Sequence, residues 1–202
     1  MVRPSGALMP GTPPQPFPNL TTGRAILRMP EATEQNAAAV VAYFSRNRDH
    51  LEKWGPIWPV DFLSVGHWMD QLQQNLDDYQ NDRAVRCFLM QRDQPDLVIG
   101  AASLTNIVRG SAQFCHLGYS IDQKWEGKSL MKESLQSLTS FGFVAMNLHR
   151  IMANYQPTND RSGWLLRSLG FTVEGYARDY LNIDGRWKDH ILTSLTNPNW
   201  QK

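Results

Sequence analysis

The residues best suited to chemistry lie in one polar turn, between an apolar strand expected at residues 114–121 and an amphipathic helix expected at 128–145. The turn carries a glycine, two lysines and a serine: Lys124, Gly127, Lys128 and Ser129. A helix that starts after such a turn presents free backbone N–H groups and the positive end of its dipole at one point. This arrangement is suited to holding a phosphate or a pyrophosphate, although a plain strand–turn–helix with solvated lysines would carry the same residues.

One known phosphate motif, the P-loop, matches only the second half of this turn. A P-loop requires a further glycine five residues before the glycine of its Gly-Lys-Ser end. Here Gly127, Lys128 and Ser129 supply that end, but the earlier position is occupied by Asp122. An aspartate in a loop that must wrap anionic phosphates argues against a nucleotide-binding P-loop.

The elements that would position this turn follow from hydrophobic periodicity and from turn residues. Strands are expected at 24–29, 85–91, 97–105, 114–121, 149–154, 171–180 and 186–195, and helices at 37–44, 61–79, 128–145 and 158–168. Thr33 is expected to cap the first helix, and Asp184-Gly185 predicts a hairpin between the last two strands. Strands and helices in this order predict a mixed sheet covered by helices, of the α/β or α+β class.

The composition is that of one globular domain preceded by a proline-rich leader. The chain has 202 residues, 42% of them hydrophobic, with seven tryptophans and eight phenylalanines. These are sufficient for a sizeable core. Six of the twelve prolines fall within residues 1–20, so this stretch is expected to be disordered and the folded domain to span 21–202.

Charge and cysteine content argue against several function classes. A net charge of +1 provides no general attraction to nucleic acid or to an anionic membrane, so no direct nucleic-acid binding is expected. No apolar run approaches the length of a membrane helix and no signal-peptide core is present, which favours a cytoplasmic location. Cys87 and Cys115 lie in expected strands, which favours buried free thiols, and no metal-spaced Cys/His cluster supports a metal site.

Seven short motifs follow one another along the chain: Val108–Ser111, Leu117–Lys128, His149–Tyr155, Asn159–Gly163, Leu169–Phe171, Glu174–Ala177 and Ile183–Thr193. In combination they resemble the Gcn5-related N-acetyltransferase (GNAT) superfamily, and within it the branch that acetylates the N-terminal alanine of ribosomal proteins. The resemblance covers roughly residues 20 to 200. It implies a mixed, mostly antiparallel central sheet with a splayed and bulged middle strand and helices on both faces. It also implies acetyl-CoA as donor and a free amine as acceptor.

The resemblance assigns the cofactor to the strand and turn already singled out. Backbone amides of Leu117, Gly118 and Tyr119 would polarise the thioester carbonyl as an oxyanion hole. Gly118 is also the expected place of the bulge, since glycine often marks one. The remaining implied contacts come from the strand end, the turn and a later helix: Ile121, Trp125, Gly127, Lys128, Ser129, Leu130, Met131, Asn159 and Ser162.

Two residues of the turn depart from the family pattern. Ser129 replaces a glycine that lets phosphate approach the backbone, which is tolerable if the serine keeps a negative φ angle. Glu126 adds a like charge beside the pyrophosphate, costing about 3 kcal/mol at about 6 Å and an effective dielectric constant of ~20. Lys124 and Lys128 are expected to offset much of this repulsion, so that acetyl-CoA binding is weakened but not abolished.

Candidates for proton transfer come from the last third of the chain and from one earlier loop. The resemblance implies Ser162 as the acid that protonates the departing thiolate, with Tyr180 as a further donor. Asn159 has an alternative, purely structural interpretation as the cap of the helix that carries Ser162. Asp179 is the favoured base and Glu52 the alternative. The non-catalytic interpretation of Asp179 is a surface ion pair with one of two nearby cations, Arg178 or Lys188.

A loop rich in tryptophan and proline is the expected wall of the acceptor groove. Trp54 and Trp58, spaced by Pro56 and followed by Pro59, would surround a small first residue such as alanine, although they would equally suit a buried corner of the core. His116 lies on the key strand and is interpreted as a core or edge histidine with satisfied hydrogen bonds.

The predicted function is direct transfer of acetyl from acetyl-CoA to the α-amino group of a protein N-terminus. In the branch that the chain resembles, the acceptor is the N-terminal alanine of a small-subunit ribosomal protein, and the ribosome is a possible partner. Two alternatives stay open. One is an acetyltransferase of a small amine, such as an antibiotic or its precursor. The other is a weakened relic of the fold that binds the ribosome or another protein, which Glu126 and Ser129 motivate.

Overall fold

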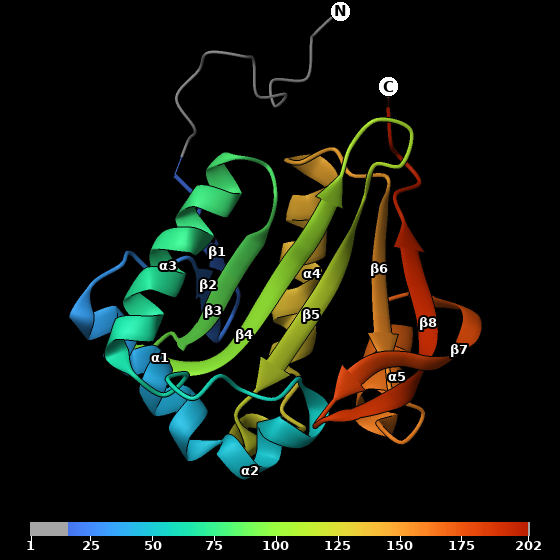
Figure 1. Cartoon of the computed structure of the whole chain (residues 1–202). Helices are drawn as coiled ribbons and strands as arrows, with labels where there is room; N and C mark the ends of the chain where they lie inside the picture. Colours follow the sequence, from blue (N-terminus) through green and yellow to red (C-terminus); the bar gives the residue numbers. More distant parts are fainter. Residues whose placement is uncertain (1–15, 202) are drawn as a thin grey trace, which may run out of the picture.

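The computed structural model describes residues 16–201, which form an eight-stranded sheet with helices on both faces (Figure 1). The strands are β1 (Leu20–Thr21), β2 (Ala25–Arg28), β3 (Val85–Gln91), β4 (Gln94–Val108), β5 (Phe114–Ile121), β6 (Arg150–Tyr155), β7 (Thr172–Ile183) and β8 (Arg186–Thr196). Their order in the sheet is β1-β2-β3-β4-β5-β6-β8-β7. Neighbouring strands are antiparallel except β5 and β6, which are parallel. The mixed, mostly antiparallel sheet is therefore confirmed.

Helices on the two faces enclose two separate hydrophobic cores. The helices are α1 (Glu34–Arg46), α2 (Arg48–Leu51), α3 (Val65–Gln80), α4 (Leu130–Val144) and α5 (Asp160–Ser168), with short 3-10 turns η1 (Glu52–Trp54) and η2 (Gln123–Trp125). On one face, Tyr43 of α1 and Trp68 of α3 pack on Phe88 of the sheet. On the other face, α4 and α5 pack Leu135 and Leu166 against the same strands (Figure 1). None of the helices between residues 16 and 201 is long and apolar enough to cross a bilayer.

Local sequence explains where most elements begin and end. The Thr33 side chain accepts a hydrogen bond from the N–H of Asn36, which confirms it as the cap of α1. The second helix was expected from residue 61, but α3 starts at Val65 because Ser64 caps it and residues 59–64 form a turn. Asp184 and Gly185 both have positive φ angles, 49° and 72°, as a two-residue hairpin between β7 and β8 requires.

The sheet divides between β5 and β6. These strands pair over only three positions, from Phe114 with Arg150 to His116 with Met152. Beyond them β5 stays paired with β4 and β6 stays paired with β8, so the two halves of the sheet separate (Figure 1). The predicted splay of the middle strand is therefore confirmed.

The predicted bulge at Gly118 is wrong. Pairing of β5 with β4 is regular from Leu117 to Ile121. The register shift in this pair lies instead in β4, between Thr105 and Val108, where Asn106 has a φ angle of 51°. A positive φ at an asparagine accommodates an extra residue at low steric cost, which explains why the irregularity sits there.

The ordered domain begins before the expected boundary at residue 21. The prediction of a disordered leader for residues 1–15 lies outside the described residues, but residues 16–20 are part of the packed domain. The ring of Phe17 meets Tyr79 and Phe141 edge-on at centroid distances of 5.7 and 5.1 Å. Leu20 follows in β1, which pairs with β2. Aromatic burial thus outweighs the local proline content at this end of the sheet.

We expect Phe17→Ala to lower the free energy of unfolding by about 1–2 kcal/mol, because a half-buried ring loses two aromatic partners. Urea denaturation followed by tryptophan fluorescence would measure this. Val144→Ala is the matched control, since Val144 is 79% exposed, and should change stability by less than about 0.5 kcal/mol. Equal effects of the two variants would mean that the leader does not contribute to the domain.

Candidate active site

The split between β5 and β6 leaves one edge of β5 without a strand partner from Leu117 onward. The Leu117 side chain is 6% exposed and belongs to the core between the sheet and α4, so only its backbone can face the split. A side chain at position 118 would lie on the other face of the sheet, and Gly118 has none. A strand edge of this kind offers backbone N–H and C=O groups to an extended ligand.

The turn that follows β5 has the backbone geometry of an anion site. Gly127 and Ser129 have positive φ angles of 71° and 60°, and Lys128 between them does not. Alternation of this kind turns successive N–H groups toward one point, as in an anion-binding nest. Ser129 makes no side-chain cap hydrogen bond, so its hydroxyl does not occupy the first N–H groups of α4. The side chains of Leu130 and Met131 are buried, which leaves only their backbone for a ligand.

The expectation that Ser129 would keep a negative φ is wrong. The serine adopts the left-handed conformation that glycine would take, so the shape of the turn is retained. The left-handed region costs a non-glycine residue about 1–2 kcal/mol. The serine in place of glycine at position 129 therefore lowers the stability of the protein and leaves the direction of the N–H groups in the turn unchanged.

Glu126 is contacted by basic side chains from two other elements. Its carboxylate pairs with Arg161 of α5 and lies 3.2 Å from Nε2 of His50 in α2. The two lysines that were expected to offset this charge do not contact it. Lys128 instead places its ammonium group 4.7 Å from the centre of the Trp125 ring. The guanidinium of Arg161 thus reduces the repulsion expected between Glu126 and an anion, and sequence reasoning identified neither Arg161 nor His50 as its partner.

Arg24, at the start of β2, is a further cation at the turn that the sequence did not reveal. Its Nη2 atom donates to the carbonyl of Lys128 at 2.6 Å and pairs with Glu133 of α4. Since 104 residues separate Arg24 from Lys128, only the tertiary fold brings them together. This contact joins the residue directly before β2 to the backbone of the turn.

Helix α5 begins beside the split and brings Ser162 to it. The Asn159 side chain accepts a hydrogen bond from the N–H of Ser162, which confirms the capping interpretation of Asn159. The Ser162 side chain lies close enough to the hydroxyl of Tyr119 on β5 to lower the pKa of that phenol. Gly163 allows this approach, because a Cβ atom there would lie 2.9 Å from the Tyr155 ring on β6.

The Tyr119 hydroxyl is a site group that sequence reasoning missed, since only the backbone of Tyr119 was singled out. Burial raises the pKa of Tyr119 to about 12, while the neighbouring Ser162 side chain acts in the opposite direction. The phenol therefore stays protonated at neutral pH. The alternation of β5 already put Tyr119 on the face that α4 covers, but only the fold could show that α5 meets it there.

Asp179 and Tyr180 lie in a bulge of β7, between Ala177 and Leu181. Asp179 is exposed with a φ angle of 45°, and its N–H donates to Asp189. Within residues 16–201 its carboxylate forms no ion pair, so the surface pair expected with Arg178 or Lys188 is absent. The hydroxyl of Tyr180 accepts a hydrogen bond at 3.4 Å from Asn154, on the part of β6 that has separated from β5.

The loop after η1 forms one pocket with the β7–β8 hairpin. The pocket has a volume of about 380 Å3, and Glu52, Trp58 and Asp184 are among its lining residues. Trp58 packs against Phe44 and Phe62, 5.6 and 4.5 Å away between ring centres. Trp54 does not line this pocket, and Glu52 is engaged by Arg48 at 2.8 Å.

A second pocket, of about 420 Å3, lies between α3 and strands β3 to β5 and was not expected. It reaches β5 at Gly118, Tyr119 and Ser120, and Ser120 lies on the face of that strand opposite to the Tyr119 side chain. Its walls combine aromatic rings with amide and imidazole groups: Phe44, Phe62, Trp68, His67, Gln71 and Asn75. The pocket thus approaches the same strand edge from the other face of the sheet.

The remaining candidate groups are a half-buried histidine and two buried cysteines. His116 keeps its Nδ1 atom buried without a hydrogen-bond partner, so the prediction of a satisfied histidine is wrong; burial lowers its pKa. Cys87 and Cys115 are buried free thiols, as expected. Burial raises the pKa of both, that of Cys115 to about 12, which keeps them protonated and unreactive. Residues 16–201 contain no His, Cys, Asp and Glu group of the kind that holds a metal.

We expect Ser129→Gly to raise the free energy of unfolding by about 0.5–1 kcal/mol, because relief of the left-handed strain exceeds the added chain entropy. Thermal unfolding would measure the change. The matched control is Ser140→Gly in the exposed middle of α4, which should lose about 0.5–1 kcal/mol. Destabilisation by both substitutions would contradict the strained geometry of Ser129.

Comparison with known proteins agrees with this arrangement. The family model described as "Acetyltransferase (GNAT) domain" matches residues 24–172. The ribosomal protein uS5-alanine N-acetyltransferase of Escherichia coli (strain K12) is 42% identical over 185 residues, 92% of this chain and 94% of that protein.

Solved structures agree as well. The ribosomal-protein-S5-alanine acetyltransferase of Vibrio fischeri superposes with a TM-score of 0.87 at 34% identity, over 92% of this chain and 100% of that one. Mycobacterium smegmatis RimJ, in complex with CoA-disulfide, superposes with a TM-score of 0.79 at 25% identity, over 88% of this chain and 84% of that one. The family model covers most of the chain, the E. coli relative is 42% identical over nearly all of it, and the split sheet is consistent with both. The chain therefore belongs to the GNAT family and is an N-acetyltransferase.

Proposed function

We propose that the chain transfers the acetyl group of acetyl-CoA to the N-terminal α-amino group of a ribosomal protein, the counterpart of uS5 with an N-terminal alanine. The acceptor is suggested by the 42% identity to the E. coli enzyme named for that substrate. The transfer chemistry is supported by one observation above all, namely that the unpaired edge of β5 leads directly into the anion-suited turn. A ribosomal acceptor would place the reaction in the cytoplasm and make the ribosome a partner.

The residues at the turn and the strand edge suit acetyl-CoA. The N–H groups from Gly127 to Met131 hold the pyrophosphate, and Arg24 and Lys128 add positive charge. Backbone groups of Leu117, Gly118 and Tyr119 pair with the extended arm and polarise the thioester carbonyl. Side chains along this path complete the site: Ile121, Trp125, Asn159 and Ser162.

Acetyl-CoA supplies a thioester that is activated toward amines. Ser162 donates its hydroxyl proton to the departing sulfur and receives one from the neighbouring Tyr119 phenol, which is reprotonated from solvent. A thiolate that is protonated as it leaves cannot return to the new amide. The high pKa of Tyr119 keeps this phenol a proton donor over the whole neutral range.

At the acceptor side, Asp179 in the exposed bulge of β7 takes the proton from the attacking amine through water. An α-amino group has a pKa of about 8, whereas that of a lysine side chain is about 10.4, so an N-terminus needs less help to become neutral. Tyr180 and Trp58 flank the acceptor, Tyr180 by way of Asn154 on the separated part of β6.

A second candidate acceptor is a small amine. The pocket between α3 and the sheet has about 420 Å3, within the range of small-molecule sites, and opens toward Gly118. Comparing kcat/KM for an alanine-initiated ribosomal peptide with that for polyamines and aminoglycosides would decide between the two. A preference of about tenfold or more for the small amine would overturn the ribosomal acceptor.

We expect Ser162→Ala to lower kcat for the peptide roughly 100-fold, because the leaving thiolate loses its proton donor. Thiol release followed with a chromogenic disulfide would measure it. Ser168→Ala, at the exposed end of the same helix, is the matched control and should retain wild-type kcat. An unchanged kcat in Ser162→Ala would remove the acid role.

Asp179→Asn should lower kcat/KM below pH 8, where the acceptor amine is largely protonated, and have little effect above about pH 9. Rates measured across this pH range would test it. Asp93→Asn, an exposed aspartate in the β3–β4 hairpin, is the control. A loss confined to Glu52→Gln would assign the base to Glu52 instead.

A further inference from the structure

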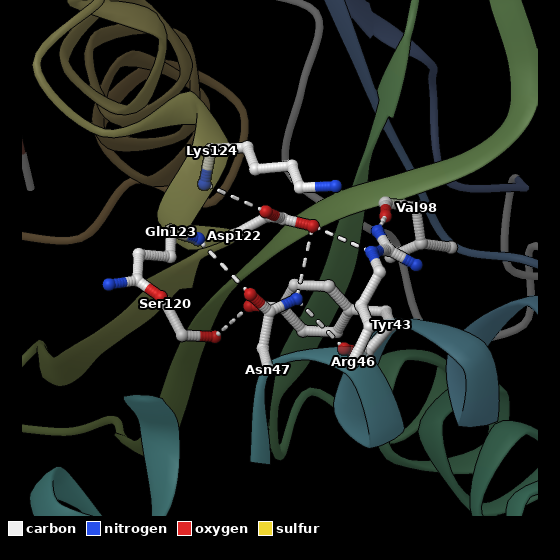
Figure 2. A network of polar contacts seen from close by, with 8 residues as sticks. All are labelled: Tyr43, Arg46, Asn47, Val98, Ser120, Asp122, Gln123 and Lys124. Atoms are coloured by element: carbon white, nitrogen blue, oxygen red, sulfur yellow. Dashed lines mark hydrogen bonds and ion pairs between the residues drawn. The ribbon is translucent and has the colours of Figure 1, made fainter. Parts of the chain in front are cut away.

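Asp122 directly follows β5 and precedes the anion-suited turn, and it is almost completely buried. It is 3% exposed, although an aspartate next to a phosphate site would be expected to turn out to solvent. Both oxygens of its carboxylate accept hydrogen bonds from other residues of the chain (Figure 2).

Three donors converge on this carboxylate. Oδ2 accepts from Nε of Arg46 at 2.6 Å and from Nδ2 of Asn47 at 3.1 Å, and Oδ1 accepts from the N–H of Lys124 at 2.9 Å. The Oδ1 atom of Asn47 accepts from the N–H of Gln123 at 3.1 Å. The end of α1 thus binds the side chain of Asp122 and the backbone that immediately follows it (Figure 2).

The same α1 residues are themselves held by the sheet. Arg46 donates to the carbonyl of Val98 in β4, and the hydroxyl of Tyr43 donates to Ser120 in β5 at 2.9 Å. The N–H of Asp122 donates to Ile99 at 2.9 Å. We call this set, Tyr43, Arg46, Asn47, Ser120 and Asp122, the Asp122 network. It joins α1, β4 and β5 at the point where the turn begins.

The carboxylate of Asp122 is ionised in this setting. Burial alone would raise its pKa, but the hydrogen bonds from Asn47, Arg46 and the Lys124 N–H outweigh burial and hold the pKa below its usual value. Its negative charge is balanced by Arg46, so the network adds no net charge beside the nest. This explains how an aspartate is compatible with an anion at the next turn.

The network anchors one end of the segment that carries the nest, and α4 anchors the other. The N–H of Gln123 donates to Asn47 and the N–H of Lys124 donates to the carboxylate of Asp122. The N–H of Trp125, the last residue of η2, donates to the Asp122 carbonyl at 2.8 Å. Five residues beyond the end of η2, Leu130 is buried in the core. Between these two anchors lie Gly127 and Ser129, whose N–H groups must point at one position.

We propose that Asp122, held by Arg46 and Asn47, is the positioning residue of the phosphate turn and sets the affinity for acetyl-CoA without taking part in the chemical step. The inference rests on the proposed function. It follows that loss of the carboxylate lets the start of the turn shift, so that fewer N–H groups reach the pyrophosphate. The thioester end, held by β5 and α5, keeps its geometry once the cofactor is bound.

The test is Asp122→Asn, which keeps the size of the side chain and removes its charge. We expect the Kd for CoA, measured by calorimetry, and the KM for acetyl-CoA to rise roughly tenfold, because hydrogen bonds to a charged group are lost. The kcat at saturating acetyl-CoA and the KM for the acceptor peptide should stay within about twofold of the wild type.

Asp78→Asn is the matched control. Asp78 is another shielded carboxylate, paired with Arg83 and Arg86 at 2.8 and 2.5 Å, but it lies between α3 and β3, away from the turn. Its loss should lower the melting temperature while leaving the Kd for CoA unchanged. A general loss of stability would affect both variants alike, so the difference in Kd isolates the positioning role.

The inference is overturned if the Asp122→Asn variant folds and keeps the wild-type affinity for CoA. It is also overturned if the kcat of this variant falls while its Kd for CoA is unchanged. If circular dichroism shows that this variant does not fold, Asn47→Ala decides on the same criteria, since it removes the bond to Gln123 and leaves the Arg46–Asp122 pair. Failure of the wild type to bind CoA would refute the proposed function as well. If the wild type binds CoA and the variants bind it with the same Kd, only the positioning role is refuted.

Discussion

The whole site depends on the three-residue pairing between β5 and β6. Each strand is held along its length by its other neighbour, β4 or β8, so the twist of the sheet separates them beyond His116 and Met152. Because the two strands are parallel, the helices that follow them, α4 and α5, start at the same edge of the sheet. An unpaired strand edge, a phosphate-suited turn and the Ser162 helix therefore meet at one place without any long loop.

Electrostatic balance around this place is achieved by residues far away in the sequence. Glu126 would repel an anion if it stood alone, but Arg161 and His50 pair with it, and its side chain is only 20% exposed. Asp122 is balanced by Arg46 from α1. These pairings reduce the repulsion that motivated the hypothesis of an inactive relic, while Ser129 keeps the glycine-like backbone. The departures from the family pattern are thus absorbed by the tertiary structure.

Helix α1 also connects the turn after β5 with the two pockets. Its C-terminal end contributes Arg46 and Asn47 to the start of the turn, and its Phe44 packs with Trp58, Phe62 and Trp68. Each of these rings lines at least one of the two pockets. One helix thereby links the walls of the pockets to the anion-suited turn.

Periodicity, caps and turn residues in the sequence determined the order of the elements, the Thr33 cap, the Asp184-Gly185 hairpin and the strand–turn–helix at 114–145, because these depend on contacts within a few residues. Family motifs identified the same turn, together with Asn159 and Ser162. Only the tertiary structure decided that Glu126 pairs with Arg161, that Tyr119 meets Ser162, that Arg24 reaches Lys128, and that the bulge lies in β4. Those contacts join residues 35 to 104 positions apart, or depend on strand register, and local sequence carries no information on either.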